Sequence, residues 1–298
     1  MIKITVLGTS SATGTKDRNF PGVALEYDGG LYLFDCGEGT QRQLAIYGIN
    51  MSKIKAIFLT HIHGDHVMGV PGLVRTLAMN KRTEPLDIFI PAGYEMNLKR
   101  LIMFDKTNIP YRLGIHGVKG GTVMGTKSFE VVAFKVDHTV KCYGYSFIQK
   151  DRLRFMKDKC TRLGIKGEMF AELEKNGRIR IHGKVIKLKD VTFKQKGKKI
   201  VYIADTRPAK SAAANARGAD ILFHEATYGS DLAARAKEYK HATAKEAAEV
   251  ARRASVKLLV LHHISARYRS ADALEAEAKE VFRNTVFAKD GMSIKLDK

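Results

Sequence analysis

The sequence predicts an α/β (α+β) protein with two β-sheets, helices on their outer faces and one inserted basic segment. Apolar, β-rich runs alternate with helical runs in both halves of the 298-residue chain. Apolar residues make up 45% of the chain, which is enough to bury a sizeable core. Residues 150–199 carry 17 Lys and Arg against 6 Asp and Glu, a local net charge of +11. We therefore expect one domain over residues 1–298, with an inserted arm at 151–195.

The first half of the chain reads mainly as strands. Residues Asp28, Gly29 and Gly30 join two β-rich runs within residues 22–37, which predicts a hairpin. Pro71 falls in the first turn of a helix expected over residues 70–81, a position that tolerates proline. The other expected elements are strands at 2–8, 54–60, 85–90, 129–138 and 143–150, and a helix at 39–48.

The second half alternates between helices and strands after the basic segment. It predicts a strand over 198–205, helix-then-strand pairs within 212–226 and 243–265, and a final helix over 271–284. No internal repeat and no low-complexity linker separates the two halves. Two sheets with outer helices therefore fit the order of the elements.

The charge of the chain indicates the kind of partner. The formal net charge is +20, and more than half of it falls in the basic segment. A balance that basic favours a polyanionic partner, most often nucleic acid. The alternative is a source proteome that is basic throughout.

The cysteines and the N-terminal residues predict a cytoplasmic protein. Cys36, Cys142 and Cys160 are scattered and odd in number, so they indicate neither a disulfide framework nor a metal clip. The run "MIKITVLGTS" is too short for the apolar core of a signal peptide. No apolar stretch reaches the roughly 20 residues that span a membrane.

Residues able to bind metal follow four apolar strands. His61 follows "AIFLT", His138 follows "VVAFKVD", Asp205 follows "IVYIA" and His263 ends "LLVLHH". Because strand ends of a packed sheet cluster in space, these side chains are expected to converge on one cleft. Imidazole and carboxylate are both good zinc ligands.

The run "HIHGDH" adds three more ligands to the same site. His61 and His63 are two residues apart, so they point the same way along an extended backbone. Gly64 permits a sharp turn that brings Asp65 and His66 back toward the same point. The full set of five histidines and two aspartates suits two Zn²⁺ ions that share a carboxylate. The alternatives are a single-metal site and polar residues that are merely satisfied at strand ends.

Other candidate motifs are set aside. The loop at residues 8–16 has the wrong spacing and residue order for a nucleotide-binding loop. His116, His182 and His262 have no partner pattern and are expected to be structural or surface residues.

From residue 1 to about residue 290, the motifs of the chain resemble the ribonuclease Z branch of the metallo-β-lactamase superfamily. The stretches that carry the resemblance are "LGTSSATGTKDRNFPG", "FDCGEGTQRQL", "LTHIHGDHVMGVPGL", "YIADTR", "LFHEATY", "KHATAKEAAEVA" and "LHHISARY". The bare HxHxDH pattern specifies only the superfamily, whereas "HEAT", the downstream "HAT" and "HISARY" narrow it to this branch. The resemblance implies an αββα sandwich and endonucleolytic removal of the 3′ extension of precursor tRNA by a metal-activated water.

The resemblance also implies roles for single residues. One zinc ion would be bound by His61, His63 and His138, the other by Asp65, His66 and His263, and Asp205 would bridge them. Mn²⁺ or another divalent metal is the alternative to zinc. Asp65 would also orient or deprotonate the attacking water.

Further roles concern the leaving group and the RNA. Glu225 and His241 would act as a pair on the departing oxygen. The expected RNA contacts are Lys16, Arg18 and Asn19 at the tRNA 3′ end, and Arg207 and Arg267 at phosphates. The arm would bind the tRNA body, although residues 163–177 lack the Gly-Pro motif usual in the family. The family is typically homodimeric.

Two rival functions use the same observations. A small-molecule phosphodiesterase or thioesterase of this fold would have no need of the basic arm. A non-catalytic RNA-binding protein with structural metals would have no need of Asp65.

Overall fold

The structure is a computed structural model that describes residues 1–104 and 108–297. Two compact units make up the chain. The larger unit contains residues 1–148 and the chain from Lys199 onward, and the smaller unit contains Gln149–Lys198.

The first sheet of the larger unit has seven strands, six from the N-terminal half of the chain and one from near its C-terminus. In spatial order they are β18 (Ser293–Leu296), β1 (Ile2–Gly8), β2 (Gly22–Tyr27), β3 (Gly30–Phe34), β4 (Ile54–Phe58), β5 (Leu86–Pro91) and β6 (Leu113–Val118). The four strands from β18 to β3 pair antiparallel, and those from β3 to β6 pair parallel.

The second sheet also has seven strands. In spatial order they are β17 (Thr285–Phe287), β16 (Leu258–His262), β15 (Ile221–Glu225), β14 (Lys199–Ile203), β9 (Cys142–Gln149), β8 (Phe129–Val136) and β7 (Gly121–Gly125). The strands from β14 to β17 run parallel, so their carboxyl ends lie at one edge of the sheet. β9 is antiparallel to β14.

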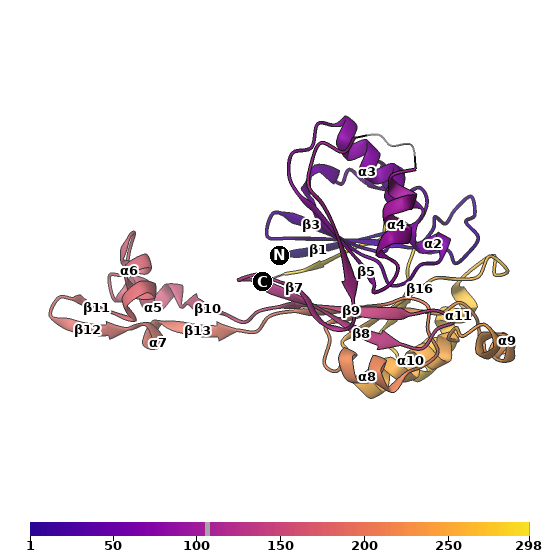
Figure 1. The fold of residues 1–298 in the computed structure, drawn as a ribbon. Helices are drawn as coiled ribbons and strands as arrows, with labels where there is room; N and C mark the ends of the chain where they lie inside the picture. Colours follow the sequence, from indigo (N-terminus) through magenta and orange to yellow (C-terminus); the bar gives the residue numbers. More distant parts are fainter. Residues whose placement is uncertain (105–107, 298) are drawn as a thin grey trace. The chain divides into compact units, whose positions relative to one another are not determined.

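Helices cover the outer face of each sheet (Figure 1). On the side of the first sheet lie α1 (Thr40–Ile46), α2 (Gly64–Val67), α3 (Gly69–Met79) and α4 (Glu95–Ile102). On the side of the second sheet lie α8 (Lys210–Ala216), α9 (Ala233–Glu238), α10 (Ala244–Ala254) and α11 (Asp272–Val281). Short 3₁₀ turns lie at Met51–Lys53 and Ser230–Leu232.

Three apolar clusters define four layers in the larger unit. One cluster joins the inner faces of the two sheets and includes Phe58 and Tyr145, and the other two pack helices onto the outer faces. The larger unit is therefore an αββα sandwich, which confirms the predicted fold class. Among the described helices, none is both long and apolar enough to cross a membrane.

Local sequence explains several boundaries. Asp28 and Gly29 have φ angles of 51° and 75°, the left-handed pair that a two-residue hairpin between β2 and β3 requires. Pro71 lies in the first turn of α3, as expected. Thr243 and Glu246 form a capping box at the start of α10, which satisfies orphan backbone N–H groups there.

The smaller unit has its own small core. Its elements are β10 (Arg152–Phe155), α5 (Lys157–Arg162), α6 (Met169–Asn176), β11 (Arg178–Ile181), β12 (Lys184–Lys187), α7 (Leu188–Val191) and β13 (Thr192–Gln195). β10 pairs with β13, and β11 pairs with β12 in a hairpin that turns at His182 and Gly183. Leu173 and Val191 are fully buried in this core. The segment expected to be inserted, 151–195, lies within this unit.

The sequence did not indicate every strand. β6, β7, β17 and β18 were not expected, nor were the four short strands of the smaller unit. β7 has two glycines and one threonine among its five residues, so it shows no apolar alternation. β17 and β18 are only three and four residues long, which is too short for a periodic pattern to be recognised.

Candidate metal centre

The expected ligands come from strand ends at one edge of the sandwich. His61 and His63 follow β4, and the short helix α2 carries Asp65 and His66. His138, Asp205 and His263 follow β8, β14 and β16. An isolated bridge between Asp137 and Arg207 ties the ends of β8 and β14 together. The prediction that strand ends bring these side chains to one place agrees with these positions.

The seven side chains form two groups that share Asp205. The ligand atoms of His61, His63, His138 and Asp205 all lie within 4.8 Å of one another, and so do those of Asp65, His66, Asp205 and His263. Each group therefore has four candidate donors, and one carboxylate belongs to both.

The two oxygens of Asp205 face different groups. Oδ2 lies 3.7 Å from His61 Nε2 and 3.6 Å from His138 Nε2. Oδ1 lies 3.4 Å from His66 Nε2 and 3.0 Å from His263 Nε2. This geometry suits a carboxylate that bridges two cations.

Orphaned polar atoms test whether the site fits a metal. His66 Nε2, His263 Nε2 and Asp205 Oδ1 are buried and make no well-aligned hydrogen bond among the described residues, although Oδ1 lies 3.0–3.4 Å from the two nitrogens. An unsatisfied buried polar atom costs about 1–3 kcal/mol, so three that converge on one point call for a bound group. Imidazole nitrogens and carboxylate oxygens at this spacing fit a divalent metal ion.

The electrostatics of the centre favour a cation as well. Burial lowers the pKa of His263, but Asp205 and Asp65 outweigh it and raise the pKa to about 10. Burial opposes ionisation of Asp65 too, yet His66 and His263 hold the pKa of its carboxyl below its usual range. The carboxylates thus stay charged and attract cations. A metal ion and protons compete for the same ligand atoms.

Two buried hydrogen-bond partners orient the ligands of the first sheet. Asp35 Oδ2 lies 2.8 Å from His66 Nδ1, and Thr60 Oγ1 lies 3.0 Å from His61 Nδ1. The Thr60 hydroxyl donates to Asp35, so it accepts from His61. Tyr202 also donates to Asp35, at 3.0 Å. His61 and His66 therefore present Nε2 to the centre, as metal-ligating imidazoles do when the other nitrogen is bound.

The ligands of the second sheet are oriented in the same way. His138 Nδ1 donates to the backbone carbonyl of Lys240 at 3.1 Å. The Thr227 hydroxyl donates to Glu225 at 2.6 Å and lies 3.0 Å from His263 Nδ1. Thr227 thereby accepts from His263, whose Nε2 is left to face the centre.

Sequence reasoning missed Asp35, Thr60 and Thr227. Asp35 directly follows β3, the same position that pointed to four of the predicted ligands. Its signal was therefore present in the sequence. Thr60 and Thr227 act only through partners that the fold brings to them.

Glu225 and His241 form a hydrogen-bonded pair beside the metal ligands. Glu225 Oε1 lies 2.9 Å from His241 Nδ1 and accepts from the backbone of Thr206 at 2.9 Å. Burial favours neutral His241, but the Glu225 carboxylate outweighs this and raises the pKa of His241. His241 Nδ1 also lies 3.9 Å from Asp205 Oδ2. The pair is thus close to the metal centre without belonging to either four-residue group.

A cleft of about 430 Å³ opens onto these residues. It is lined by ligands from both groups, by His241 and by Tyr228 and Tyr239. Substrate that enters this cleft meets the metal centre and the histidine of the pair together.

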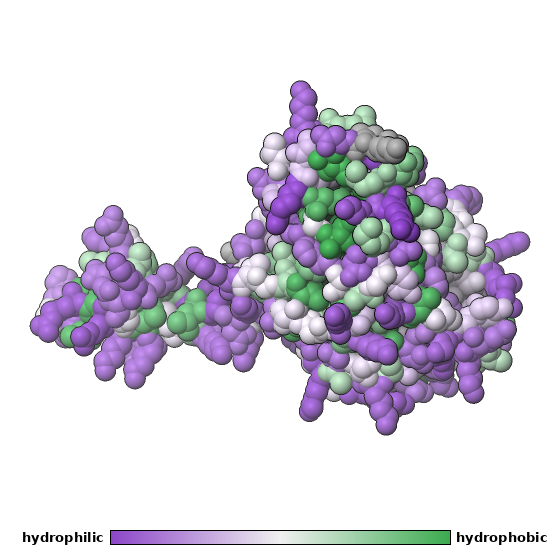
Figure 2. Space-filling model, in the orientation of Figure 1, coloured by the Kyte–Doolittle hydropathy of each residue, from purple (hydrophilic) through white to green (hydrophobic). Residues whose placement is uncertain are grey.

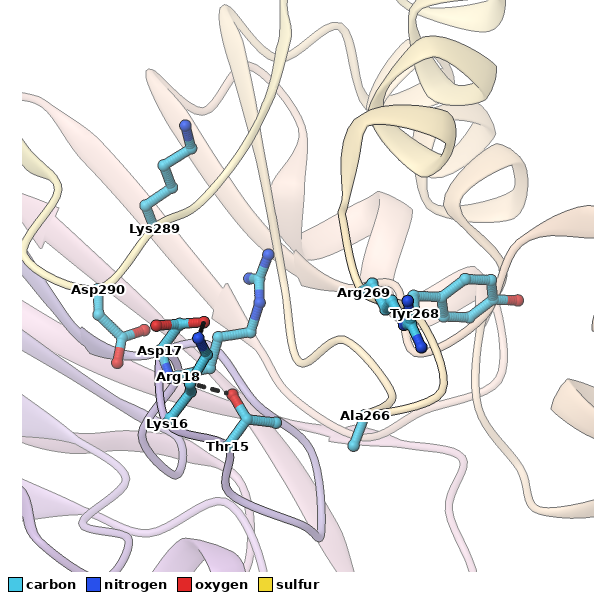
Figure 3. A pocket seen from close by; sticks show the side chains of 9 residues that line it. All are labelled: Thr15, Lys16, Asp17, Arg18, Ala266, Tyr268, Arg269, Lys289 and Asp290. Carbon is cyan, nitrogen blue, oxygen red and sulfur yellow. Dashed lines mark hydrogen bonds and ion pairs between the residues drawn. The ribbon is translucent and has the colours of Figure 1, made fainter.

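The expected RNA-contact residues separate into two sets. Lys16 and Arg18 line a second cleft of about 550 Å³, where Arg269 and Lys289 add two cations that the sequence did not single out (Figure 3). Asn19 donates to the backbone of Glu38 instead. In Figure 3, the loop with Lys16 and Arg18 faces the loop with Ala266 and Arg269 across this cleft.

Arg207 and Arg267 lie elsewhere. Arg267 is exposed and is not among the residues that line either cleft. Arg207 hydrogen-bonds the backbone carbonyl of His241 and forms an ion pair with Glu246. Its guanidinium therefore faces protein groups.

The three histidines set aside earlier belong to neither metal-ligand group. His116 pairs with Asp87 at 2.8 Å, and His262 Nε2 lies 3.1 Å from the carbonyl oxygen of Ile203. His182 lies at the turn of the β11–β12 hairpin with a φ angle of 47°.

Known proteins are similar to this chain in sequence and in fold. Residues 2–176 match the family model of the anti-Pycsar protein Apyc1, and residues 157–264 match that of the β-lactamase superfamily domain. A ribonuclease Z of Methanothermobacter thermautotrophicus is 39% identical over 298 residues, which cover 99% of this chain and 97% of the relative. A ribonuclease Z of Archaeoglobus fulgidus is 41% identical over 303 residues, which cover 99% and 98%.

Solved structures agree with the sequence relatives. The crystal structure of human tRNase Z, short form, superposes with a TM-score of 0.73 at 25% identity and covers 99% of this chain and 100% of that chain. YhfI from Bacillus subtilis, a metallo-β-lactamase fold protein, has a TM-score of 0.71 at 20% identity over 98% of both chains, which shows the fold alone. With full-length relatives at this identity, the chain belongs to the ribonuclease Z family, the tRNA 3′-processing endoribonucleases of the metallo-β-lactamase fold.

Proposed function

We propose that the protein removes the 3′ extension of precursor tRNA by hydrolysis of a phosphodiester at this metal centre, with two Zn²⁺ ions per subunit. The observation that carries the proposal is Asp205, whose two oxygens face two different groups of ligands. A single-metal site would leave one of these two four-donor groups without a cation.

The ligands divide as the geometry groups them. His61, His63 and His138 would bind one ion, Asp65, His66 and His263 the other, and Asp205 both. Zn²⁺ suits this mixture of imidazole and carboxylate, with Mn²⁺ or another divalent metal as the alternative. Bound there, the metals supply a water with a pKa near 7 and offset negative charge on the phosphate.

Asp65 orients or deprotonates the attacking water. Its carboxylate lines the cleft, with 9% of the side chain exposed, and it lies 3.5 Å from His263 Nε2. Because neighbouring histidines hold its pKa below the usual range, Asp65 is ionised at neutral pH and is ready to accept a hydrogen bond. This role is distinct from the charge that it adds to the centre.

His241 protonates the departing 3′-oxygen. Its Nδ1 is bound to Glu225, so Nε2 is the nitrogen left to donate. The raised pKa favours the protonated ring, and the residue lines the cleft. A general acid of this kind contributes roughly 10²–10⁴-fold to the rate.

RNA binding would come from two basic regions. The cleft lined by Lys16, Arg18, Arg269 and Lys289, against the two carboxylates of Asp17 and Asp290, would bind phosphates of the RNA. The smaller unit, Gln149–Lys198, would be the arm that binds the tRNA body, and hydrophilic side chains cover most of its visible face (Figure 2). Phosphate contacts position a substrate without reading its sequence, which suits an enzyme that acts on many tRNAs.

We further propose a cytoplasmic homodimer. The compartment is supported by Cys36, Cys142 and Cys160, which are all buried and unpaired. The dimer rests on the family alone, and sedimentation equilibrium of the purified protein tests it: a mass of one chain at micromolar concentration would contradict it.

Incubation of the purified protein with a 3′-extended precursor tRNA, with and without a chelator, tests the function. We expect one cut near the end of the acceptor stem, a 3′-hydroxyl on the tRNA product, loss of cleavage with chelator and recovery with added Zn²⁺. Bound metal, measured by inductively coupled plasma mass spectrometry, should approach two ions per chain. Hydrolysis of small phosphodiesters without cleavage of RNA would favour the small-molecule hydrolase, and RNA binding without any hydrolysis would favour the binding protein.

A further inference from the structure

Two tyrosines line the metal-centre cleft, and they differ in exposure. Tyr228 is 7% exposed and packs its ring edge-on near His241, with centroids 6.1 Å apart. Tyr239 is 45% exposed although its side chain is large and largely apolar. It lines the same cleft of about 430 Å³ as the ligands His138 and His263. The cleft therefore presents an aromatic ring to whatever enters it.

A cation supports the Tyr239 ring. The guanidinium carbon of Arg235 lies 5.0 Å from the centroid of the ring, in a cation–π contact. The neighbouring Tyr228 side chain raises the pKa of the Arg235 guanidinium, which therefore stays charged. One face of Tyr239 is thus occupied by Arg235, and the exposed area of the ring remains for a flat ligand.

The backbone fixes Tyr239 relative to His241. Helix α9 ends with two capping bonds, from His241 N to Ala236 O at 2.8 Å and from Lys240 N to Lys237 O at 3.4 Å. Lys240 takes the left-handed conformation, with a φ angle of 56°. This is the Schellman pattern of a helix C-terminus, and it reverses the chain between the two residues.

The same turn is tied to the metal ligands. The carbonyl of Lys240 accepts a hydrogen bond from His138, and Lys240 Nζ pairs with Asp137 at 2.8 Å. Tyr239 and His241 thus flank a residue that is anchored on both its backbone and its side chain. A ring held in this way loses little conformational freedom when a ligand stacks on it.

Nucleobases are the flat ligands that a ribonuclease cleft receives. Single-stranded RNA ends are recognised largely by stacking on aromatic side chains, and such stacking tolerates any base because every base has a π face. The phosphodiester to be cleaved joins two nucleotides, and Tyr239 lines the same cleft as His241, so the ring is within reach of a base that flanks the cut.

We propose that Tyr239 stacks on the base of a nucleotide that flanks the cleaved phosphodiester, and that this contact holds the single-stranded end in the cleft whatever its sequence. The inference rests on the proposed function and adds to it a binding site for a nucleobase. Tyr239 is a binding residue here, since its ring touches substrate but moves no proton.

Three precursor tRNAs test the proposal. One is unmodified, one lacks the base 5′ of the cut, and one lacks the base 3′ of the cut. Tyr239→Leu should reduce kcat/KM about 5- to 150-fold on the unmodified RNA, mainly through KM. On the RNA that lacks the stacked base, Tyr239→Leu and the wild type should agree within about twofold. Tyr239→Phe should stay close to wild type on all three, because it keeps the ring.

Controls separate this proposal from the proposed function. Tyr94→Leu replaces a partly buried tyrosine in another cluster and should leave kcat/KM unchanged. Metal content and melting temperature of each variant show whether the fold survives. An equal loss for Tyr239→Leu on all three RNAs, no loss on the unmodified RNA, or an equal loss for Tyr239→Phe would overturn the stacking role. If the wild type leaves the unmodified RNA uncut, the proposed function itself is rejected.

Discussion

The guanidinium of Arg207 hydrogen-bonds the backbone carbonyl of His241 and pairs with Glu246 through both terminal nitrogens. Glu246 in turn accepts from the backbone N–H of Thr243 at 2.9 Å. The loop that carries His241 is thereby clamped to the first turn of α10. This contact supports a positioning role, where sequence analysis expected a phosphate contact.

Arg207→Ala should slow the chemical step more than it weakens RNA binding. Without the clamp, His241 would sample positions away from the leaving oxygen, and small displacements in an active site cost up to about 10²-fold in rate. We expect single-turnover cleavage to fall about 10- to 100-fold at saturating RNA. Arg207→Lys should recover only part of the rate, because an ammonium lacks the paired geometry of the guanidinium.

Arg267→Ala is the matched comparison for Arg207→Ala. Arg267 is exposed, so as a phosphate contact it would raise KM and reduce the slope of log affinity against log salt by about 0.7–0.9. Arg207→Ala should leave that slope unchanged. If Arg207→Ala reduces the slope of log affinity against log salt and leaves the single-turnover rate normal, Arg207 contacts a phosphate, as the sequence analysis expected.

Asp65→Ala should abolish cleavage and leave tRNA affinity nearly intact. The carboxylate lies within the ligand cluster, 3.4 Å from His66 Nε2. The basic residues proposed to bind RNA line the second cleft or belong to the smaller unit. Single-turnover assays and filter binding measure the two effects. Because Asp65 is also a proposed ligand, metal content has to be measured in parallel. Near-wild-type turnover with full metal content would remove Asp65 from the mechanism.

His241→Ala should lower turnover in proportion to how poor the leaving group is. A ribose 3′-oxygen needs a proton as it departs, whereas an activated nitrophenolate leaves with little help. Cleavage of precursor tRNA should therefore fall by roughly 10²–10⁴-fold and hydrolysis of a nitrophenyl phosphodiester far less. If both substrates slow by one factor, or if metal is lost, His241 is a structural residue or a ligand.

Glu225→Gln should shift the pH dependence of cleavage. Burial disfavours protonated His241, and the Glu225 carboxylate 2.9 Å away outweighs it, so the pKa of His241 is raised. A general acid acts only while protonated, so activity falls as pH rises through this pKa. Loss of the carboxylate charge lowers the pKa and should move the alkaline limb of kcat to lower pH. An unmoved limb in Glu225→Gln would assign the limb to another group.

Replacement of residues 151–195 by a short Gly/Ser linker should separate RNA recognition from chemistry. All seven proposed ligands lie in the larger unit, whereas the smaller unit has its own core around Leu173. Cleavage of precursor tRNA should fall strongly while nitrophenyl phosphodiester hydrolysis survives. An equal loss on both substrates would mean that the deletion damages the larger unit.

The sequence by itself determined the fold class, the ligands as candidates and the family. Apolar runs bounded by turn residues predict strands locally, and "HIHGDH" places four donors within six residues of one chain segment. These signals need no knowledge of distant contacts. For the same reason, the glycine-rich and very short strands such as β7 and β17 gave no signal.

Only the tertiary structure decided which side chains serve those ligands. Thr227 and His263 are 36 residues apart and meet at 3.0 Å, and Tyr202 reaches Asp35 across 167 residues. Arg207 finds Glu246 across 39 residues, and the exposure of Tyr239 depends on where α9 ends. Such pairings arise because folding brings together the ends of neighbouring strands and of the two facing sheets, and no periodicity along the chain encodes those contacts.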